Sequence, residues 1–228
     1  KKIIFERADG IVFQTKGAME FFGDKLKNKY KIIPNPIPSN IQVCRLTDNR
    51  EKTIVSVARL WIYQKRQDVL LYAFREFSKI HKNYTLTLYG DGPDEDKIHK
   101  LIKKLKLENK VIVAGAHNNV IDLIKKASVF VLSSDFEGMP NALIEAMAIG
   151  LPVISTDCSP GGAKYLIKNG INGLLVKRSD YKELSQALCY MIENPNEARR
   201  MGLNAMQVVD LLNEKNIYDE WECFLQNI

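Results

Sequence analysis

The chain has 228 residues, of which 46% are hydrophobic and 26% are charged, values that predict a globular protein with a sizeable core. No apolar run approaches the roughly 18 residues of a membrane span, and the first residues show no signal-peptide cleavage site. The net charge of +6 suits an acidic small molecule or an anionic membrane surface as partner. The basic residues are spread along mixed-charge helix faces without an aromatic platform, which argues against a nucleic-acid-binding protein.

The four cysteines lie far apart and form no CxxC pair; they are Cys44, Cys158, Cys189 and Cys223. Such spacing is typical of free thiols in a reducing cytosol and not of disulfides or a metal site. We therefore expect a cytoplasmic protein, whose positive charge would also suit peripheral contact with the inner face of the membrane.

Residues 1–38 contain one strand–helix–strand unit, whose first strand is predicted over 10–15. Pro34, Pro36 and Pro38 follow this unit. A proline-rich exit cannot continue a sheet and is typical of an interdomain linker. We therefore expect residues 1–38 to be the end of a preceding domain.

Residues 39–195 alternate between strand-like and helical segments. Continuous Val/Ile/Leu runs predict buried parallel strands over 53–59, 84–90, 110–115, 129–134, 152–157 and 173–176. Helices are predicted over 68–81, 94–105, 120–127, 141–149, 163–169 and 180–193. This alternation predicts a doubly wound α/β domain with a parallel sheet, to which residues 196–228 add helices without strands.

In such sheets ligands bind beyond the carboxyl ends of the strands, so the loops at these ends are the candidate site. The loop after Ser134 contains Gly138 and Pro140 and leads into the helix 141–149, whose N-terminus would attract an anion. That helix is apolar nearly all round, yet it carries Glu145. A buried carboxylate is costly without partners, so Glu145 needs either a structural cation or a ligand that bears hydroxyl groups.

The loop after the strand 53–59 carries two cations. Arg59 stands at the strand end and Lys65 just before the next helix. Together they could neutralise a diphosphate, the arginine through a bidentate fork and the lysine as a point charge. The alternative is that both are solvated surface residues.

The segment YGDGP (89–93) suggests two further kinds of site. Gly90 and Gly92 would allow close backbone approach, but Glu95 stands where a dinucleotide-binding fingerprint needs its third glycine, which disfavours a dehydrogenase. Asp94 and Asp96 form a DxD pattern that could bind Mg²⁺ or Mn²⁺. Because they lie at a helix start, where the dipole favours acids, we expect no metal there.

The strand 110–115 ends in Gly115, Ala116 and His117. The glycine lets the backbone come near a ligand, and His117 could donate a hydrogen bond to a base. A surface histidine is the alternative. No other cluster of His, Cys and acidic residues has metal-site spacing, so we expect neither a metal nor another cofactor.

Together these segments resemble the C-terminal, donor-binding domain of the retaining GT-B-fold glycosyltransferases of family 4 (glycosyl transferases group 1), a Rossmann-like domain. The most specific match is the E-x7-E motif from Glu137 to Glu145. The segments SVARL…QKRQD, YGDGP and NGINGLLV accompany it in the family's order and near its spacing. The resemblance is strong over 53–195 and looser over 1–52 and the last helices.

The resemblance implies a role for each matching residue. Arg59 and Lys65 would contact the donor diphosphate, Glu145 the ribose hydroxyls and Glu137 the hydroxyls of the transferred sugar. The other donor-binding positions that it implies are Gly138, Met139, Pro140, Asn141, Leu143, Gly90, Gly115, Ala116 and His117, of which the last three would lie near the base.

The implied reaction is the retaining transfer of a sugar from a nucleoside-diphosphate sugar, with UDP as the expected nucleotide, to a glycan or lipid-linked acceptor in polysaccharide or glycoconjugate synthesis. In this family the acceptor is thought to attack the sugar from the same face that the leaving nucleotide occupies, which retains the anomeric configuration. The donor phosphate would help to deprotonate the acceptor. Neither a protein nucleophile nor a metal is then required. The last helices would pack back toward the N-terminal domain, which would hold most of the acceptor site.

Two departures from the family pattern concern the donor site. The Arg–Lys interval is one residue longer than usual, with residues 61–64 between Leu60 and Lys65, and Tyr165 stands where a Glu is common. These departures leave the details of donor recognition open.

Two alternative functions remain open at this stage. A sugar-nucleotide epimerase can share the fold and the phosphate site, because fold does not fix the reaction. A non-catalytic nucleotide-sugar-binding module is the other, although loss of one of the four charged site residues would have favoured it and all four are present.

Overall fold

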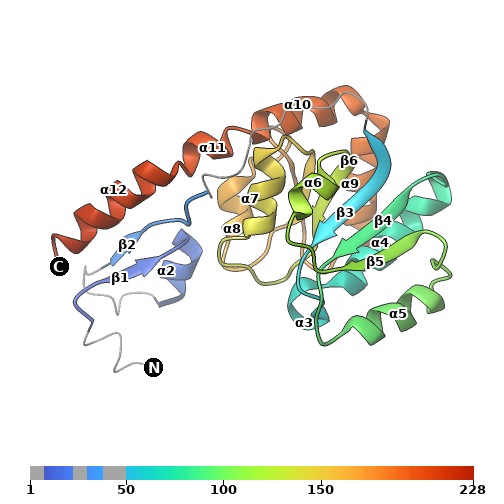
Figure 1. Cartoon of the computed structure of the whole chain (residues 1–228), viewed down its shortest axis with the longest axis horizontal. Coiled ribbons are helices and arrows are strands. Elements are labelled where there is room, and N and C mark those ends of the chain that lie inside the picture. Colours follow the sequence, from blue (N-terminus) through green and yellow to red (C-terminus); the bar gives the residue numbers. More distant parts are fainter. Residues whose placement is uncertain (1–7, 23–29, 38–49) are drawn as a thin grey trace.

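The computed structural model describes residues 8–22, 30–37 and 50–228, and its centre is a six-stranded sheet (Figure 1). The strand order is β5-β4-β3-β6-β7-β8, and every pairing is parallel. The strands are β3 (Glu51–Val57), β4 (Thr85–Tyr89), β5 (Val111–Gly115), β6 (Ala127–Leu132), β7 (Val153–Thr156) and β8 (Leu174–Val176). The predicted α/β class is confirmed.

Helices cover both faces of this sheet (Figure 1). They are α3 (Ile62–Lys65), α4 (Gln67–Ile80), α5 (Glu95–Lys104), α6 (Val120–Ile124), α7 (Asn141–Ala148), α8 (Gly162–Leu166) and α9 (Tyr181–Glu193). One hydrophobic core lies under α4, α5 and α9, and a second lies under α6, α7 and α8. In β3, Ile54 belongs to the first core and its neighbour Val55 to the second, which explains why these strands are continuous apolar runs.

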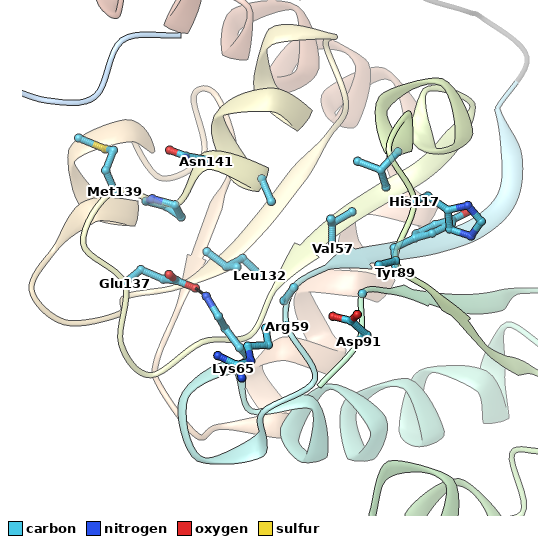
Figure 2. Close-up of a pocket in the computed structure, with 16 residues that line it drawn as sticks. Val57, Arg59, Lys65, Tyr89, Asp91, His117, Leu132, Glu137, Met139 and Asn141 are labelled. Carbon is cyan, nitrogen blue, oxygen red and sulfur yellow. Dashed lines mark hydrogen bonds and ion pairs between the residues drawn. The ribbon is translucent and has the colours of Figure 1, made fainter. Parts of the chain in front are cut away.

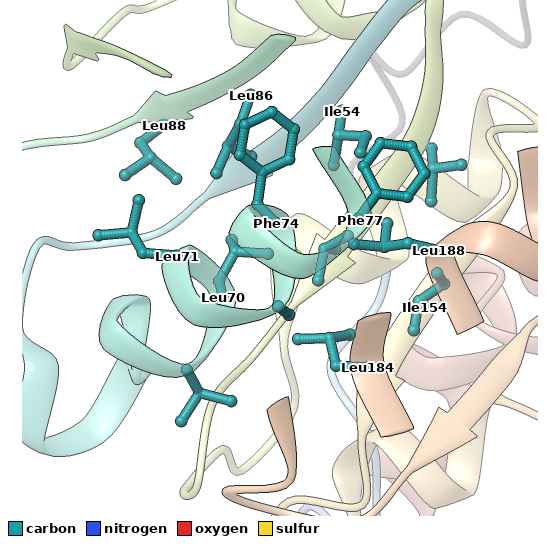
Figure 3. Packing of buried hydrophobic residues seen from close by; sticks show 14 of the residues in the cluster. Ile54, Leu70, Leu71, Phe74, Phe77, Leu86, Leu88, Ile154, Leu184 and Leu188 are labelled. Carbon is teal, nitrogen blue, oxygen red and sulfur yellow. The ribbon is translucent and has the colours of Figure 1, made fainter. Parts of the chain in front are cut away.

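Helix α4 shows how the first core is filled. Leu70, Phe74 and Phe77 recur at the spacing that places side chains on one face of a helix, and all three are 0% exposed. Figure 3 shows them between the strand residue Leu86 and Leu188 of α9. The core packing therefore fixes α4 on the sheet, and α4 begins two positions after α3, the short helix that follows β3.

Two predicted helices end earlier than expected. α6 stops at Ile124 because β6 already begins at Ala127. α8 stops at Leu166, whose carbonyl accepts a hydrogen bond from the Asn172 side chain at 3.0 Å. The side-chain oxygen of Asn172 also accepts from the N–H of Lys168 at 2.7 Å, so one asparagine closes the turn that ends the helix.

The N-terminal unit has the predicted strand–helix–strand order. β1 (Ile11–Phe13) and β2 (Tyr30–Ile32) pair in parallel, and α2 (Lys16–Phe22) lies between them in the chain. Residues 33–37 then run without regular structure toward the large domain. Pro38 and the predicted boundary at 38/39 lie outside the described residues.

The C-terminal helices divide between the two units. α10 (Pro195–Ala205) and α11 (Val208–Leu211) contribute Ala198, Ala205 and Val208 to the cores of the large domain, whose packing thus continues past the predicted boundary at residue 195. α12 (Glu214–Leu225) then runs back along the N-terminal unit (Figure 1), where Lys31 Nζ lies 3.7 Å from a carboxylate oxygen of Glu220. The last helix therefore contacts the N-terminal unit.

Two expectations from composition concern the whole chain. Cys158, Cys189 and Cys223 are free thiols in the structure, and Cys44 lies outside the described residues. Of the helices in the described part of the chain, none has both the length and the apolar character needed to cross a bilayer.

The core packing gives a stability prediction. Phe74→Ala should lower the free energy of unfolding by about 3–5 kcal/mol, because it removes a fully buried ring and leaves a cavity. Urea denaturation measures the difference. Ile80→Ala on the same helix is the matched control: Ile80 is 67% exposed, so its loss should change stability by no more than about 0.5 kcal/mol. Equal effects of the two substitutions would contradict the assigned packing.

Candidate functional site

A pocket of about 530 Å³ lies at the carboxyl ends of the strands. Its centre is the junction of β3 and β6, where the strand order reverses: β4 and β5 extend to one side of β3, and β6 to β8 to the other. This is the position at which open α/β sheets bind ligands. The pocket is lined by Val57, Ala58, Arg59, Lys65, Tyr89, Gly90, Asp91, Ala116, His117, Val120, Leu132, Glu137, Met139, Pro140, Asn141 and Ala142.

An ion pair between Lys65 and Glu137 forms one end of the pocket (Figure 2). Lys65 Nζ lies 2.6 Å from Glu137 Oε1, and the two side chains are 17% and 9% exposed. The hydroxyl of Ser134 donates to the same Oε1 at 2.6 Å. The second oxygen, Oε2, has no hydrogen-bond partner among the described residues, so it remains available to a ligand. Each of the three N–H bonds of an ammonium can donate, so Lys65 also keeps donors for a second partner.

The loops that carry this pair are bonded to each other. The Ser133 hydroxyl donates to the carbonyl of Lys65 at 2.8 Å, and the Asp135 N–H donates to the carbonyl of Gln64 at 2.9 Å. In return the Gln64 side chain donates to the carbonyl of Phe136 at 2.9 Å. Three bonds thus hold Lys65 and Glu137 in register, although they lie 72 positions apart in the chain.

Arg66 strengthens the same junction, a role that was not predicted. It adopts the left-handed conformation at φ 50° between α3 and α4, and its guanidinium contacts Asp68 Oδ1 at 3.0 Å and Asp135 Oδ2 at 2.6 Å. The hydrogen bonds that Arg66 donates to Asp68 and to Asp135 raise the pKa of Arg66 above its ordinary value. Neither acid carried a sequence signal that would have named its partner.

The predicted DxD pattern is a structural feature. Asp94 Oδ2 accepts from the N–H of Ile62 at 2.9 Å, and Oδ1 accepts from Lys97 Nζ at 2.6 Å. These donors lower the pKa of Asp94, the Lys97 hydrogen bond contributing most. Since both oxygens are engaged by the protein, Asp94 fixes the start of α3 and thereby the loop that carries Lys65.

One group of possible metal ligands comes together only in the folded chain. His81, Cys189 and Glu193 place their ligand atoms within 4.8 Å of one another, although no such cluster was expected from spacing. His81 follows the C-terminal end of α4 and the other two lie on α9, so the group belongs to the sheet edge opposite the pocket. Sequence spacing missed it because the residues come from different helices. His81 Nε2 and Glu193 Oε1 lie 3.1 Å apart as a direct pair.

The N-terminus of α7 opens onto the pocket. Pro140 occupies the N-cap position rather than the predicted first turn, and it offers no side-chain acceptor. The Leu143 and Ile144 N–H groups both donate to the Pro140 carbonyl. The N–H groups of Asn141 and Ala142 have no backbone acceptor within the described segments, and both residues line the pocket. Two N–H groups without a backbone acceptor therefore stand at the helix start beside the pocket, the position at which an anion site was predicted.

Glu145 lines a neighbouring cavity of about 200 Å³, together with Asn35, Pro36, Asn141 and Ile144. Asn141 borders both cavities and stands one helical turn before Glu145, on the same face of α7. Burial raises the pKa of the Glu145 carboxyl above its ordinary value. Within the described part of the chain no side chain or N–H pairs with it, so the structural cation that the sequence left open is not found there.

The opposite end of the pocket is formed by His117 and Tyr89 (Figure 2). The two rings meet edge to face with centroids 5.8 Å apart, and His117 Nε2 lies 2.9 Å from the carbonyl oxygen of Ala114. Burial, with a smaller effect of Glu51, raises the pKa of Tyr89. The histidine is thus held by its own loop, with one ring nitrogen already engaged.

Four predicted donor-binding residues lie outside the lining of the main pocket. Glu145 is one of them, as described above. Leu143 is fully buried in the core, so its side chain packs the domain and contacts no ligand. Gly115 does not line the pocket, but its carbonyl accepts a hydrogen bond at 2.7 Å from the N–H of Gly90, which does. The Gly138 carbonyl packs on Gly162, where an added Cβ would lie 1.9 Å from it. These two glycines position the loops that line the pocket.

Asp91 and Tyr89 line the pocket without having been predicted. Both flank Gly90, and their position at a strand end was the signal that could have identified them. With Asp91 included, two acids face the two bases Arg59 and Lys65. The attraction for an anion therefore depends on where these charges stand and on the helix N-terminus, and not on an excess of positive charge.

The family described as Glycosyl transferases group 1 matches residues 41–208. This chain belongs to that family. An uncharacterized glycosyltransferase of Haemophilus influenzae is 31% identical over 99% of this chain and 63% of its own length. An N-acetylgalactosaminyltransferase of Campylobacter jejuni, which acts on a diphospho-undecaprenol-linked sugar according to its name, is 32% identical over 84% of this chain and 53% of its own length. The glycosyltransferase chain thus spans only part of these relatives.

Solved structures agree on the fold. Anabaena HepE in complex with UDP and glucose superposes with a TM-score of 0.87, at 20% identity, over all of this chain and 68% of its own. The pneumococcal O-GlcNAc transferase GtfA in complex with UDP and GlcNAc gives 0.83, at 21% identity, over 99% of this chain and 46% of its own. The likeness confirms the predicted fold, that of the C-terminal domain of a GT-B glycosyltransferase.

The raised pKa of Glu145 gives a prediction for the ligand-free glycosyltransferase domain. The folded state binds the proton more tightly than the unfolded chain, so the contribution of Glu145 to stability is present at low pH and is lost as pH rises past its ordinary pKa. Glu145→Gln should therefore raise the melting temperature by about 1–3 °C at pH 8, and this gain should vanish below about pH 4.

Thermal denaturation between pH 4 and pH 8 measures this difference. Glu108→Gln, on an exposed loop position, is the matched control and should leave the melting temperature unchanged. A lower melting temperature for Glu145→Gln at every pH would mean that the carboxylate has a stabilising partner in the folded protein.

Proposed function

We propose that this domain binds a nucleoside-diphosphate sugar, with UDP as the nucleotide, and that the enzyme to which it belongs transfers the sugar with retention of configuration, as in glycosyltransferase family 4. One observation carries the proposal: an arginine, an uncapped helix N-terminus and a hydroxyl-accepting carboxylate converge on one pocket. The arginine and the helix N-terminus suit a diphosphate, and the carboxylate suits the hydroxyl groups of a sugar. The UDP complexes of the structural neighbours support the choice of nucleotide.

The diphosphate would lie at the centre of the pocket. Arg59 can offer a bidentate fork, and the N–H groups of Asn141 and Ala142 are aligned at the positive end of α7. Lys65 keeps two ammonium donors after pairing with Glu137. Lys65 and the helix N-terminus are fixed before the donor arrives, so together with Arg59 they can stabilise the charge of the departing nucleotide without a metal ion.

The transferred sugar would lie at the Lys65–Glu137 end. Glu137 Oε1 is held by Lys65 and by the Ser134 hydroxyl, which leaves Oε2 to accept hydrogen bonds from sugar hydroxyls. A carboxylate engaged in this way is well placed to orient a sugar and poorly suited to attack it. This supports a positioning role for Glu137 and a mechanism in which the donor phosphate helps to deprotonate the acceptor.

The nucleoside would occupy the remaining part of the site. The loop of Ala116 and His117 would face the base, beside the edge of Tyr89. Glu145 would accept hydrogen bonds from the ribose hydroxyls across the boundary that Asn141 shares between the two cavities. Such bonds would satisfy the half-buried carboxylate that has no partner in the described ligand-free structure.

The acceptor would be a glycan or a lipid-linked saccharide, and the product would belong to a polysaccharide or glycoconjugate. The names of the relatives favour transfer over epimerisation and over a non-catalytic role, since both relatives described above are named as transferases. Peripheral contact with an anionic membrane surface would fit the net charge of +6 and a lipid-linked acceptor.

Donor binding can be tested by ligand-induced stabilisation in the presence of EDTA. UDP at about a hundredfold excess over its dissociation constant should raise the melting temperature by about 5 °C or more. Arg59→Ala and Glu145→Ala should each remove most of this shift. Glu193→Ala, at the opposite sheet edge, is the matched control and should retain it in full. If UDP, GDP and ADP all leave the melting curve unchanged, the donor site is assigned wrongly.

The role of Glu137 can be separated from nucleotide binding by calorimetry. The sugar donor is chosen as the tightest binder among UDP-glucose, UDP-galactose and UDP-N-acetylglucosamine. Glu137→Gln should weaken this donor about 10-fold or more, because a neutral amide accepts sugar hydroxyls less strongly than a carboxylate. UDP itself should change by less than about threefold. Equal losses for UDP and the sugar donor would contradict a contact with the sugar.

A further inference from the structure

Three aromatic side chains are exposed on the loops that carry the Lys65–Glu137 pair. Trp61 is 38% exposed, Tyr63 71% and Phe136 44%. Tyr63 stands two residues before Lys65, and Phe136 directly precedes Glu137. The cluster, which we call the aromatic rim, consists of these three residues. It results in part from the longer Arg–Lys interval, which contains Trp61 and Tyr63.

The rings form a continuous apolar surface. Trp61 and Tyr63 have centroids 5.9 Å apart at an interplanar angle of 37°, and Tyr63 stacks on Phe136 at 6.2 Å and 22°. Single exposed apolar side chains are ordinary, but a contiguous group of aromatic rings on a surface usually marks a binding site. Tyr and Trp also combine an apolar body with a polar group, which suits a ligand that is partly wet.

The aromatic rim is held in place without a ligand. The Trp61 carbonyl accepts from the N–H of Gln64 at 3.1 Å and of Lys65 at 2.8 Å, and Asp94 fixes the N–H of Ile62. The side chain of Gln64 bonds the carbonyl of Phe136 across the two loops at 2.9 Å. The conformational entropy of these loops is therefore lost on folding and not on binding, which favours recognition by the exposed rings.

The position of the aromatic rim indicates which class of ligand it would bind. It adjoins the end of the pocket where Glu137 would hold the transferred sugar, and an acceptor hydroxyl has to reach that end for transfer to occur. The acceptor molecules proposed above are saccharides. A pyranose ring has apolar C–H faces with hydroxyl groups around its edge, so it can stack on an aromatic side chain while its hydroxyls stay in water.

We propose that Trp61, Tyr63 and Phe136 form a stacking platform for a pyranose ring of the acceptor saccharide, beside the donor pocket. The platform rests on the proposed function, because the acceptor is a saccharide only if the protein is a sugar transferase. In this proposal the donor-binding domain takes part in acceptor recognition. Trp61 and Tyr63, which lie in the longer Arg–Lys interval, would then contact the acceptor.

Trp61 itself can report binding. The chain has two tryptophans, Trp61 and Trp221, so Trp221→Phe leaves Trp61 as the single indole. In that background, saturated with UDP, methyl α-D-glucopyranoside, methyl β-D-galactopyranoside and methyl N-acetyl-β-D-glucosaminide are titrated while fluorescence is recorded. At least one should give a saturable change, and glycerol at equal concentration should give none.

Variants connect the signal to the platform. Tyr63→Ala and Phe136→Ala should each weaken the saccharide about 3- to 10-fold, whereas Tyr63→Phe should bind within about twofold of the parent because it keeps the ring. Tyr63 is 71% exposed, so its loss should leave the fold intact, which the melting temperature checks. Tyr190→Ala removes a tyrosine that is 41% exposed on α9 and serves as the matched control without effect.

The outcomes separate this proposal from the donor site. UDP-induced stabilisation is measured on every variant and should stay within about 1 °C of the parent. If UDP binds but no saccharide gives a saturable signal, or if glycerol reproduces it, the platform is wrong while the donor site stands. A response to phosphatidylcholine–phosphatidylglycerol vesicles alone would make the rim a membrane contact and overturn the proposal. If UDP fails to bind, the proposed function falls first.

Discussion

The hydrogen bonds between the loops that follow β3 and β6 are the constraint on which the site depends. These strands are neighbours in the sheet, yet their loops are far apart in sequence, and the bonds of Ser133, Asp135 and Gln64 join them into one unit. That unit sets the distance between Lys65 and Glu137, places Asp135 against Arg66 and supports the aromatic rim. A change in this junction would therefore disturb Lys65, Glu137 and the aromatic rim together.

The helix α7 shows how stability and binding compete in this domain. Its apolar residues are needed for the second core, and the same burial makes the charge of Glu145 unfavourable. Its first N–H groups remain without a side-chain cap, which is a further cost in the free state. A ligand that supplies hydroxyl groups and negative charge, as in the proposed donor complex, would offset both costs.

Much of the fold followed from the sequence because its causes are local. Continuous apolar runs placed the strands, and the alternation with helices gave the parallel sheet, with boundaries shifted where an asparagine or the next strand ended a helix. The sequence also predicted that residues at the carboxyl ends of the strands would lie close together, since parallel strands bring these ends to one edge of the sheet. Arg59, Lys65, Glu137 and His117 indeed line one pocket.

Only the tertiary structure decided which of these groups touch. In the folded chain Lys65 pairs with Glu137, Asp94 accepts a hydrogen bond from the backbone N–H of Ile62, and His81 lies beside Glu193. The tertiary structure also placed Leu143 in the core and opened a separate cavity at Glu145. The physical reason is the distance along the sequence over which each effect acts. Strand and helix periodicity act over a few neighbouring residues, whereas each of these contacts joins separate elements whose distance is set by the packing of the whole sheet.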